Sequence, residues 1–207
     1  MVQLISDKGH EIASHSLYHK RFTDLSIDTI KNDLIVSKSL LEDASGKEVL
    51  GFRAPDFCLP INYDIIDYLL DSGYKYDSSL IYTNIHDVYG KTKSESGIFC
   101  YDNGLIEFPI SNISIFNTIS LPLGGGGYLR LYPKWITKYF LKKKKSPLVY
   151  LHPYELGGNY PKNLNMNIYR RFRHTYNIDN VPEKTATIIE DFNAISSVLT
   201  FLVISFP

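Results

Sequence analysis

Three of the six histidines lie within ten residues, in the segment 9–20. His15 and His19 stand four residues apart, and residues with that spacing project from one face of a helical turn. Two neutral imidazoles presented in this way can share a divalent metal such as zinc. Ser14 and Ser16 flank His15 and could hold its ring through hydrogen bonds. The spacing also arises by chance at polar helix ends, so on its own it leaves a plain surface role open.

The residues around this pair extend the pattern. The run Gly-His-Glu-Ile-Ala-Ser-His-Ser-x-x-His, which starts at Gly9, resembles the second motif of the polysaccharide deacetylases, the NodB-homology or carbohydrate esterase family 4 proteins. The resemblance implies that His15 and His19 are metal ligands, with zinc as the expected ion. It continues over residues 5–192 and is similar to the branch associated with bacterial exopolysaccharide and exosortase gene clusters, which carries a C-terminal extension.

Arg53 follows a predicted strand and begins the run Arg-Ala-Pro-Asp-Phe. Pro55 forces Ala54 out of the helical region, so the chain turns sharply after Arg53. The run matches the Arg-x-Pro-x-Phe motif of the family, in which the arginine orients the catalytic aspartate. Without the resemblance, an arginine paired with a structural carboxylate would be the better interpretation.

His152 also stands at the end of a predicted strand, in the run Leu-His-Pro-Tyr-Glu. This run resembles the fifth motif of the family, Leu-His-Pro-x-Glu, in which the histidine is the general acid towards the leaving amine. Histidine suits that task because its pKa lies near neutrality. The branch usually has tryptophan where this chain has Tyr154. A core histidine bonded to the backbone is the alternative interpretation.

The run of four glycines at 124–127 precedes Tyr128 and is similar to a Gly-Gly-Gly-Tyr-x-Arg segment of the branch. Glycine lets a backbone approach a ligand closely, and the run lacks the Gly-Lys-Ser/Thr ending of a phosphate loop. We interpret it as a loop that faces the substrate, an acetylated polysaccharide or oligosaccharide, although a flexible connector would show the same composition. The expected substrate-binding residues are Gly125, Gly126, Tyr128 and Tyr154.

The first motif of the family supplies an acidic general base and an acidic metal ligand, and no residue before Asp7 matches it. The resemblance implies an α/β fold, a distorted, incomplete (β/α) barrel of the NodB-homology type. Here the barrel is expected to lack its first strand and to leave one edge unpaired. Two hypotheses follow. One is a metal-dependent hydrolase that removes N-acetyl or O-acetyl groups from a polysaccharide and has lost its N-terminal part. The other is an inactive remnant or a carbohydrate-binding pseudoenzyme.

Composition narrows the function classes. The 207 residues contain 22 Lys and Arg against 22 Asp and Glu, and zero net charge argues against general nucleic-acid binding. The apolar tail at 198–207 is too short to span a bilayer, so no membrane span is expected. Cys58 and Cys100 are too few for a disulfide framework and indicate buried or half-buried thiols in a reducing compartment. Since no signal peptide is visible, we expect a cytoplasmic protein.

Hydrophobic periodicity and turn residues predict the elements that position these side chains. Residues 1–7 are expected to be the tail of a helix that Gly9 closes, and further helices are expected over 23–45, 62–72, 133–145 and 182–193. Strands are expected over 12–14, 49–52, 74–76, 105–111 and 148–151. Residues 81–104 are expected to form a long loop over the site. The domain boundaries predicted are a barrel at 1–160 and an extension at 161–207. The inward faces of the two most regular helices are predicted to carry Ile27, Ile30, Leu34, Ile35 and Leu41, and Trp135, Ile136, Tyr139, Phe140 and Leu141.

Overall fold

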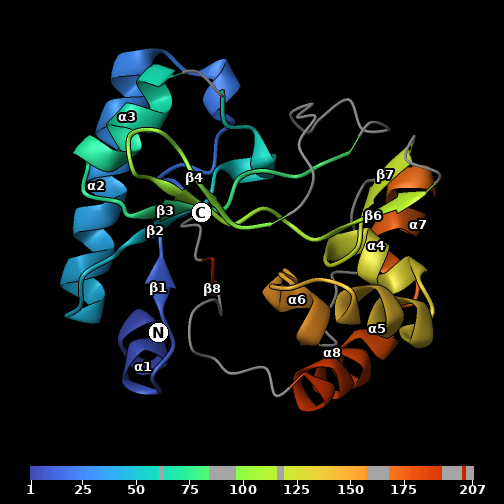
Figure 1. Ribbon diagram of the computed structural model, residues 1–207. Coiled ribbons are helices and arrows are strands. Elements are labelled where there is room, and N and C mark those ends of the chain that lie inside the picture. The colour runs from blue at the N-terminus through green and yellow to red at the C-terminus, as the bar shows by residue number, and fades with distance from the viewer. Residues whose placement is uncertain (61–62, 84–96, 116–118, 158–167, 193–201, 204–207) are drawn as a thin grey trace.

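Short parallel strands run through the middle of the molecule, with helices on either side (Figure 1). The computed structural model describes residues 1–60, 63–83, 97–115, 119–157, 168–192 and 202–203. Its four-stranded sheet has the order β2-β3-β5-β4, in which only the β4–β5 pair is antiparallel. The strands are β1 (Ile12–Ala13), β2 (Gly51–Phe52), β3 (Tyr76–Asp77), β4 (Phe99–Cys100) and β5 (Ile106–Glu107).

A single parallel bridge extends this sheet at its β2 edge, where Ser14 pairs with Phe52 and so joins β1 to β2. Two further parallel bridges, Ile81 with Ile110 and Gly125 with Tyr150, lie outside the named strands. The outer edge of β1 carries β8 (Leu202–Val203), so the edge that we expected to be unpaired has a partner strand. The α/β class with a parallel sheet is therefore confirmed. Among the described residues no strand pairing closes the sheet into a ring, and the barrel stays a prediction.

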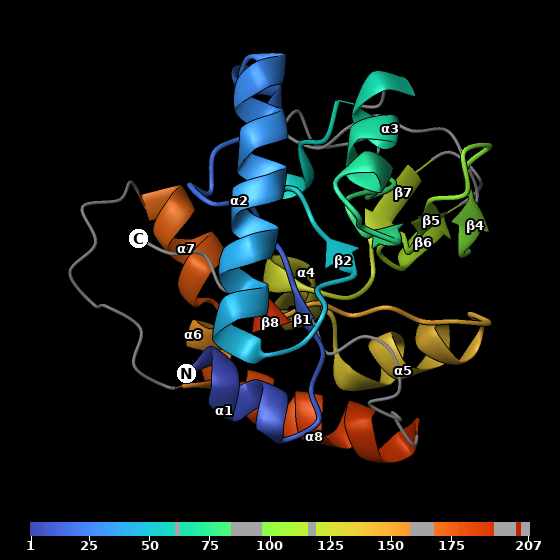
Figure 2. The ribbon, with the colours of Figure 1, turned by 90° about the vertical axis from the view of Figure 1, so that its left-hand side faces the viewer.

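The helix α2 (Ile27–Ser45) lies across β1 and is the longest element of the described chain (Figure 2). Its predicted caps are present. The Ser26 Oγ accepts a hydrogen bond from the Thr29 N–H at 3.3 Å, and Gly46 ends the helix in the left-handed region at φ 67°. The inward face of α2 is centred on residues 30, 34 and 41, which are buried as predicted. The prediction is wrong for Ile27 and Ile35, whose exposed fractions are 39% and 58%.

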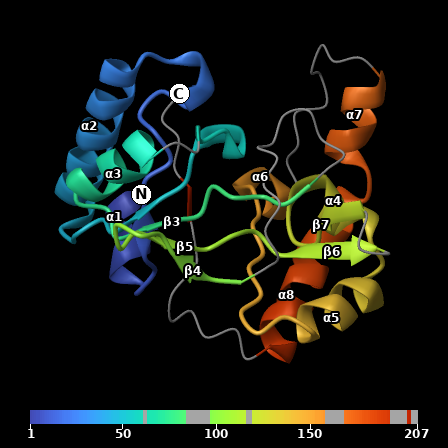
Figure 3. The same ribbon diagram turned by 45° about the horizontal axis from the view of Figure 1, so that its top comes forward.

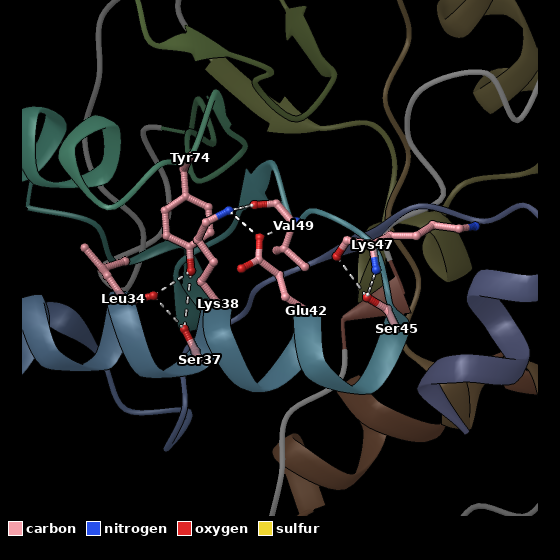
Figure 4. A network of polar contacts seen from close by, with 8 residues as sticks. All are labelled: Leu34, Ser37, Lys38, Glu42, Ser45, Lys47, Val49 and Tyr74. Carbon is pink, nitrogen blue, oxygen red and sulfur yellow. Dashed lines mark hydrogen bonds and ion pairs between the residues drawn. The ribbon is translucent and has the colours of Figure 1, made fainter.

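Polar contacts fasten α2 to the strands beneath it (Figure 4). The Tyr74 hydroxyl donates to the Leu34 carbonyl at 2.9 Å. The Lys38 ammonium donates to the Glu42 carboxylate at 2.8 Å and to the Val49 carbonyl, and the Val49 N–H donates to the same carboxylate at 2.9 Å. These polar groups therefore keep hydrogen-bond partners although they are removed from water. The same contacts fix the position of α2 along the sheet.

The remaining helices form two groups (Figures 1 and 3). Together with α2, α1 (Val2–Asp7) and α3 (Tyr63–Asp71) belong to the N-terminal half, and the others to the C-terminal half. The C-terminal helices pack over a hairpin of β6 (Asn112–Ile115) and β7 (Ile119–Pro122). They are α4 (Gly126–Leu131), α5 (Lys134–Lys142), α6 (Pro153–Leu156), α7 (Ile168–Thr175) and α8 (Val181–Asp191); short 3-10 turns are Phe22–Asp24, Pro55–Phe57 and Ile178–Asn180.

Three predictions about these elements are corrected. The expected loop at 81–104 contains β4, because Phe99 and Cys100 pair with β5. The exposed fractions of Trp135 and Tyr139 are 70% and 53%, so they lie outside the apolar face predicted for α5. Cys100 is exposed, whereas Cys58 is buried as expected, and neither cysteine forms a disulfide. In the part of the chain that the structure describes, no helix is long and apolar enough to cross a membrane.

Candidate active site

The structure brings the four predicted catalytic and metal-binding residues to the same end of the parallel strands. His15 follows β1 and its bridge residue, Arg53 follows β2, and His152 follows the bridge at Tyr150. Burial is the main cause of the lowered pKa of His15, and His19, Arg53 and His152 lie near enough to contribute to it, which places the four within electrostatic reach of one another. The carboxyl ends of parallel strands are where α/β folds hold their chemistry.

The two metal-binding candidates, His15 and His19, are adjacent, but a helical turn is not what brings them together. The ring centroids of His15 and His19 are 4.9 Å apart, with an angle of 68° between the ring planes. The segment is a turn rather than a helix, since Ser16 and His19 have φ values of 72° and 52°. Two residues in the left-handed region reverse the chain and bring the second ring back beside the first.

A hydrogen bond sets the state of the His15 ring. Its Nδ1 lies 2.6 Å from the Arg53 carbonyl, an acceptor, so Nδ1 carries the hydrogen and Nε2 has a lone pair. Burial is the largest of the effects that lower the pKa of His15, to about 3. The ring is therefore neutral at neutral pH, which is the form that binds a metal.

The turn between the histidines is held by Asp33 on α2. Its carboxylate accepts hydrogen bonds from the Ser16 hydroxyl at 2.9 Å and from the Leu17 N–H at 3.0 Å. The side chains of Ser14 and Ser37 also meet, with their Oγ atoms 2.8 Å apart. Sequence analysis did not identify Asp33, although an aspartate on the buried side of a regular helix is an unusual feature that could have marked it.

Replacing Asp33 with alanine is expected to reduce the free energy of unfolding by about 2 kcal/mol, because the turn loses charge-assisted hydrogen bonds in a buried setting. Asp33→Asn keeps one acceptor oxygen and should lose about half as much. Asp43→Ala on the exposed side of α2 is the control and should change stability by less than about 0.5 kcal/mol. Urea denaturation measures all three. Equal losses in Asp33→Ala and Asp43→Ala would contradict the assigned role.

Arg53 is buried below the turn and is tightly held. Its Nε donates to the Ser78 carbonyl at 2.9 Å and its Nη2 to the Ser78 hydroxyl at 2.7 Å, while the guanidinium lies over the Phe57 ring at 5.6 Å. Burial lowers the pKa of Arg53 to about 10, and the charges of Asp77 and Glu107 oppose that shift. The carboxylates of Asp77 and Glu107 therefore lie near Arg53, which agrees with the interpretation that this arginine pairs with structural carboxylates.

Asp77 and Glu107 are register partners on β3 and β5 and are fully buried. The Ser79 N–H and hydroxyl donate to Asp77 at 3.0 and 2.7 Å, and the Leu80 N–H donates to Glu107 at 3.0 Å. Burial raises the pKa of both carboxyl groups, and the charge of Asp77 raises the pKa of Glu107 further, well above its ordinary value. The pair is therefore expected to retain one proton, on Glu107, opposite the cation of Arg53.

His152 stands at the N-terminus of α6, where Glu155 orients it. The Glu155 Oε2 accepts the His152 backbone N–H at 2.8 Å and lies 3.1 Å from the ring Nδ1. The ring stacks on Tyr154 with centroids 5.4 Å apart and meets the edge of Tyr150. Burial is the first cause of a lowered pKa for His152, followed by the charge of Arg130. Because Nδ1 faces a carboxylate, Nε2 is the ring atom left for proton transfer.

Arg130 anchors this arrangement from below. It forms an ion pair with the second carboxylate oxygen of Glu155, and the two side chains are 3% and 0% exposed. Sequence analysis missed this ion pair, although both residues stood inside motifs that it quoted. Polar contacts therefore link Arg130 through Glu155 to His152. The orientation of the His152 ring depends on the buried ion pair of Arg130 and Glu155.

The glycine run that precedes Arg130 is not the predicted loop. Gly126 begins α4, and Gly125 packs against Tyr150 at φ 135°, where an added Cβ would fall 2.1 Å from the ring. The absence of a side chain lets the segment contact the strand at residue 150. Tyr128 is half-buried on α4. The substrate-binding roles of Gly125, Gly126, Tyr128 and Tyr154 stay predictions.

A metal ion would find part of a coordination shell here. The neutral His15, with its Nε2 lone pair, and the adjacent His19 ring fit two positions of a zinc-like site. The described residues contain no group of three or more histidine, cysteine, aspartate or glutamate side chains that could hold a metal. A third protein ligand is therefore not offered by the described part of the chain.

Comparison with known families divides the chain into two matched regions. Residues 1–76 match the polysaccharide deacetylases, and residues 78–199 match a family described as a domain of unknown function, DUF3473. The second match covers more than half of the chain. The junction between the two regions falls inside the barrel domain that we predict at 1–160.

Individual relatives agree with these matches. The chain is 24% identical over 158 residues to a peptidoglycan deacetylase of Helicobacter pylori, covering 75% of this chain and 52% of that protein. It is 38% identical over 76 residues to a peptidoglycan deacetylase-like protein of Gibberella zeae, covering 37% and 22%. The chain thus spans about half, or less, of these relatives.

A crystal structure of a Mycobacterium smegmatis protein assigned to the polysaccharide deacetylases is also similar. It has 27% sequence identity and a TM-score of 0.39, over 53% of this chain and 35% of that one. The His motif and the Arg-x-Pro-x-Phe motif both lie in the region that the first family covers. The chain therefore belongs to the DUF3473 family, and its N-terminal residues 1–76 match the polysaccharide deacetylases.

Proposed function

We propose that this chain is part of a metal-dependent hydrolase that removes N-acetyl, or in some substrates O-acetyl, groups from a polysaccharide. The observation that supports it best is the gathering of His15, His19, Arg53 and His152 at one end of the parallel strands. The named activity of the relatives from H. pylori and G. zeae points to polymers of N-acetylated sugars as the first substrates to test.

In this proposal each residue has a separate task. His15 and His19 would hold the metal, which when bound activates water and polarises the acetyl carbonyl. His152 is neutral and has Nδ1 turned towards Glu155, so its Nε2 can take up a proton and deliver it to the departing sugar amine. Arg53 holds the His15 ring in place through its backbone carbonyl. The general base and the acidic ligand would come from residues outside the motifs found here.

Zinc binding tests the metal site directly. Calorimetry on the purified chain is expected to show one zinc per chain, with affinity at least 10-fold weaker in His15→Ala and in His19→Ala. His10→Ala is the matched control, because His10 lies at the opposite end of β1 and should leave zinc affinity unchanged. Equal weakening in all three variants, or no binding to a folded chain, would contradict a metal site built on these two residues.

Acetate release tests the reaction. With zinc present, hydrolysis of N-acetylglucosamine oligomers by the chain, completed by any further segment that its gene encodes, is expected to fall about 100-fold in His152→Ala. His10→Ala removes a histidine at the opposite end of β1 and serves as control. Binding of oligomers without acetate release, at full zinc occupancy, would favour the carbohydrate-binding pseudoenzyme instead.

A further inference from the structure

Charge is distributed very unevenly along this electrically neutral chain. The stretch 108–154 contains seven lysine and arginine residues and no aspartate or glutamate. The remaining residues therefore carry 15 cations against 22 anions, a net charge of −7. A protein with such a division presents regions of opposite potential, and the basic one attracts anionic partners.

Four of the seven cations of 108–154 lie consecutively at the end of α5 and directly after it. Arg130 is buried in the ion pair with Glu155, and the α5 residues Lys134 and Lys138 are paired with acidic residues of α8. The four consecutive lysines at 142–145 follow directly. Lys142, Lys143 and Lys145 are exposed, whereas Lys144 is half-buried beside Asn112.

Large apolar side chains are exposed on α5 and just before it. Trp135 and Tyr139 stand one turn apart on α5 and are 70% and 53% exposed, and Leu131, the last residue of α4, is 54% exposed. The Lys143 ammonium lies 4.1 Å from the centroid of the Tyr139 ring, so the lysines continue this surface without a gap. Figures 1 and 3 show α5 at the periphery of the C-terminal half.

A hollow with a mixed polar and apolar lining adjoins the lysines. It has a volume of about 670 Å³, and residues 143–145, Ser111, Asn112 and Ser146 line it together with apolar residues such as Phe108 and Ile110. The Lys144 ammonium donates to the Asn112 amide oxygen at 3.4 Å. Ammonium and hydroxyl groups around a hollow of this kind are suited to an anionic headgroup.

We propose that this face, defined by Leu131, Trp135, Tyr139 and the lysines at 142–145, docks the protein onto a membrane surface rich in anionic lipid. Tryptophan and tyrosine prefer the boundary between headgroups and acyl chains, and clustered lysines attract anionic lipids. A glycan would use the aromatic rings but not Leu131, and a nucleic acid would use the lysines but not the apolar residues. The proposal is independent of the deacetylase activity.

The chain offers its own probe, because Trp135 is its only tryptophan. Mixing the protein with vesicles of phosphatidylglycerol and phosphatidylcholine is expected to move its emission to shorter wavelength and to carry the protein into the vesicle pellet. Pure phosphatidylcholine vesicles should do neither. Binding should be lost near 1 M salt, where the screening length is about 3 Å.

Matched variants separate this surface from general charge. Lys142→Gln, Lys143→Gln and Lys145→Gln combined should weaken vesicle affinity about 100-fold, since each lysine near the surface contributes about fivefold. The control combines Lys8→Gln, Lys31→Gln and Lys75→Gln, which removes the same charge from the N-terminal half and should weaken affinity less than about threefold. For the apolar part, Trp135→Ala should weaken affinity about 10-fold, and Ile35→Ala, at a position 58% exposed on α2, should have no effect.

Several results would overturn the proposal. These are no binding to anionic vesicles by the folded protein, equal losses in the two triple variants, or binding without a shift in Trp135 emission. If an anionic polysaccharide shifts the Trp135 emission and vesicles do not, the face would be assigned to a glycan instead.

Discussion

Glu155→Ala is expected to lower the free energy of unfolding by about 3–5 kcal/mol, because it leaves the Arg130 guanidinium buried without its carboxylate. Both side chains are almost fully removed from water, so solvent cannot replace the lost partner. The same change releases the backbone N–H and the ring of His152, both of which face Glu155. Urea denaturation followed by circular dichroism measures the loss.

A double-mutant cycle shows whether the effect belongs to the pair. Arg130→Met combined with Glu155→Ala should be less destabilised than the sum of the two single variants, since the double variant buries no uncompensated charge. The exposed pair of Lys134 and Glu183 is the matched control, and Glu183→Ala should cost less than about 1 kcal/mol. Additive losses in the buried cycle would show that Arg130 and Glu155 do not stabilise each other.

Arg53→Met is expected to cost a similar amount, about 3–5 kcal/mol at pH 8, for a related reason. Removing the cation leaves the Asp77 carboxylate buried, with its charge stabilised only by hydrogen bonds, chiefly from Glu107 and Ser79. The folded protein then favours the protonated form of Asp77, and the pKa of Asp77 in the variant rises further above its unfolded value of about 4.

The sign of the pH dependence follows from that rise. A carboxyl group whose pKa is higher in the folded state binds more protons there, so its contribution to stability falls as pH rises from about 4 through the folded pKa. The difference in free energy of unfolding between Arg53→Met and the wild type should therefore be largest at pH 8 and become smaller towards pH 4 in urea titrations. A gap that does not change with pH would show that Arg53 stabilises the fold by packing alone.

Glu107→Gln is the matched variant for the same site. The amide is neutral at every pH, and its oxygen can still accept the hydrogen bond from Leu80. Burial and the charge of Asp77 raise the pKa of Glu107 well above its ordinary value. The variant should therefore be as stable as the wild type near pH 5 and at least as stable as the wild type at pH 8. A large loss at both pH values would contradict a protonated Glu107.

Local sequence features determined the elements and the order of the motifs. Ser26 and Gly46 mark the start and end of α2 because capping groups satisfy the helix ends through neighbouring residues only. The runs that end at His15, Arg53 and His152 were each expected after a strand, and parallel strands then bring such ends together. The quoted motifs also led to the correct family before any contact was known.

Tertiary contacts decided what those local features leave open. The adjacency of His15 and His19 depends on a left-handed turn that Asp33 holds from another element, and no helical spacing describes it. Arg130 is buried because Glu155, 25 residues away, neutralises it, which turned an expected loop arginine into an anchor for His152. The outward position of Trp135 is likewise set by α8, which covers a different side of α5. Caps and periodicity act within one element, whereas these properties depend on the desolvation and pairing of groups from distant parts of the chain.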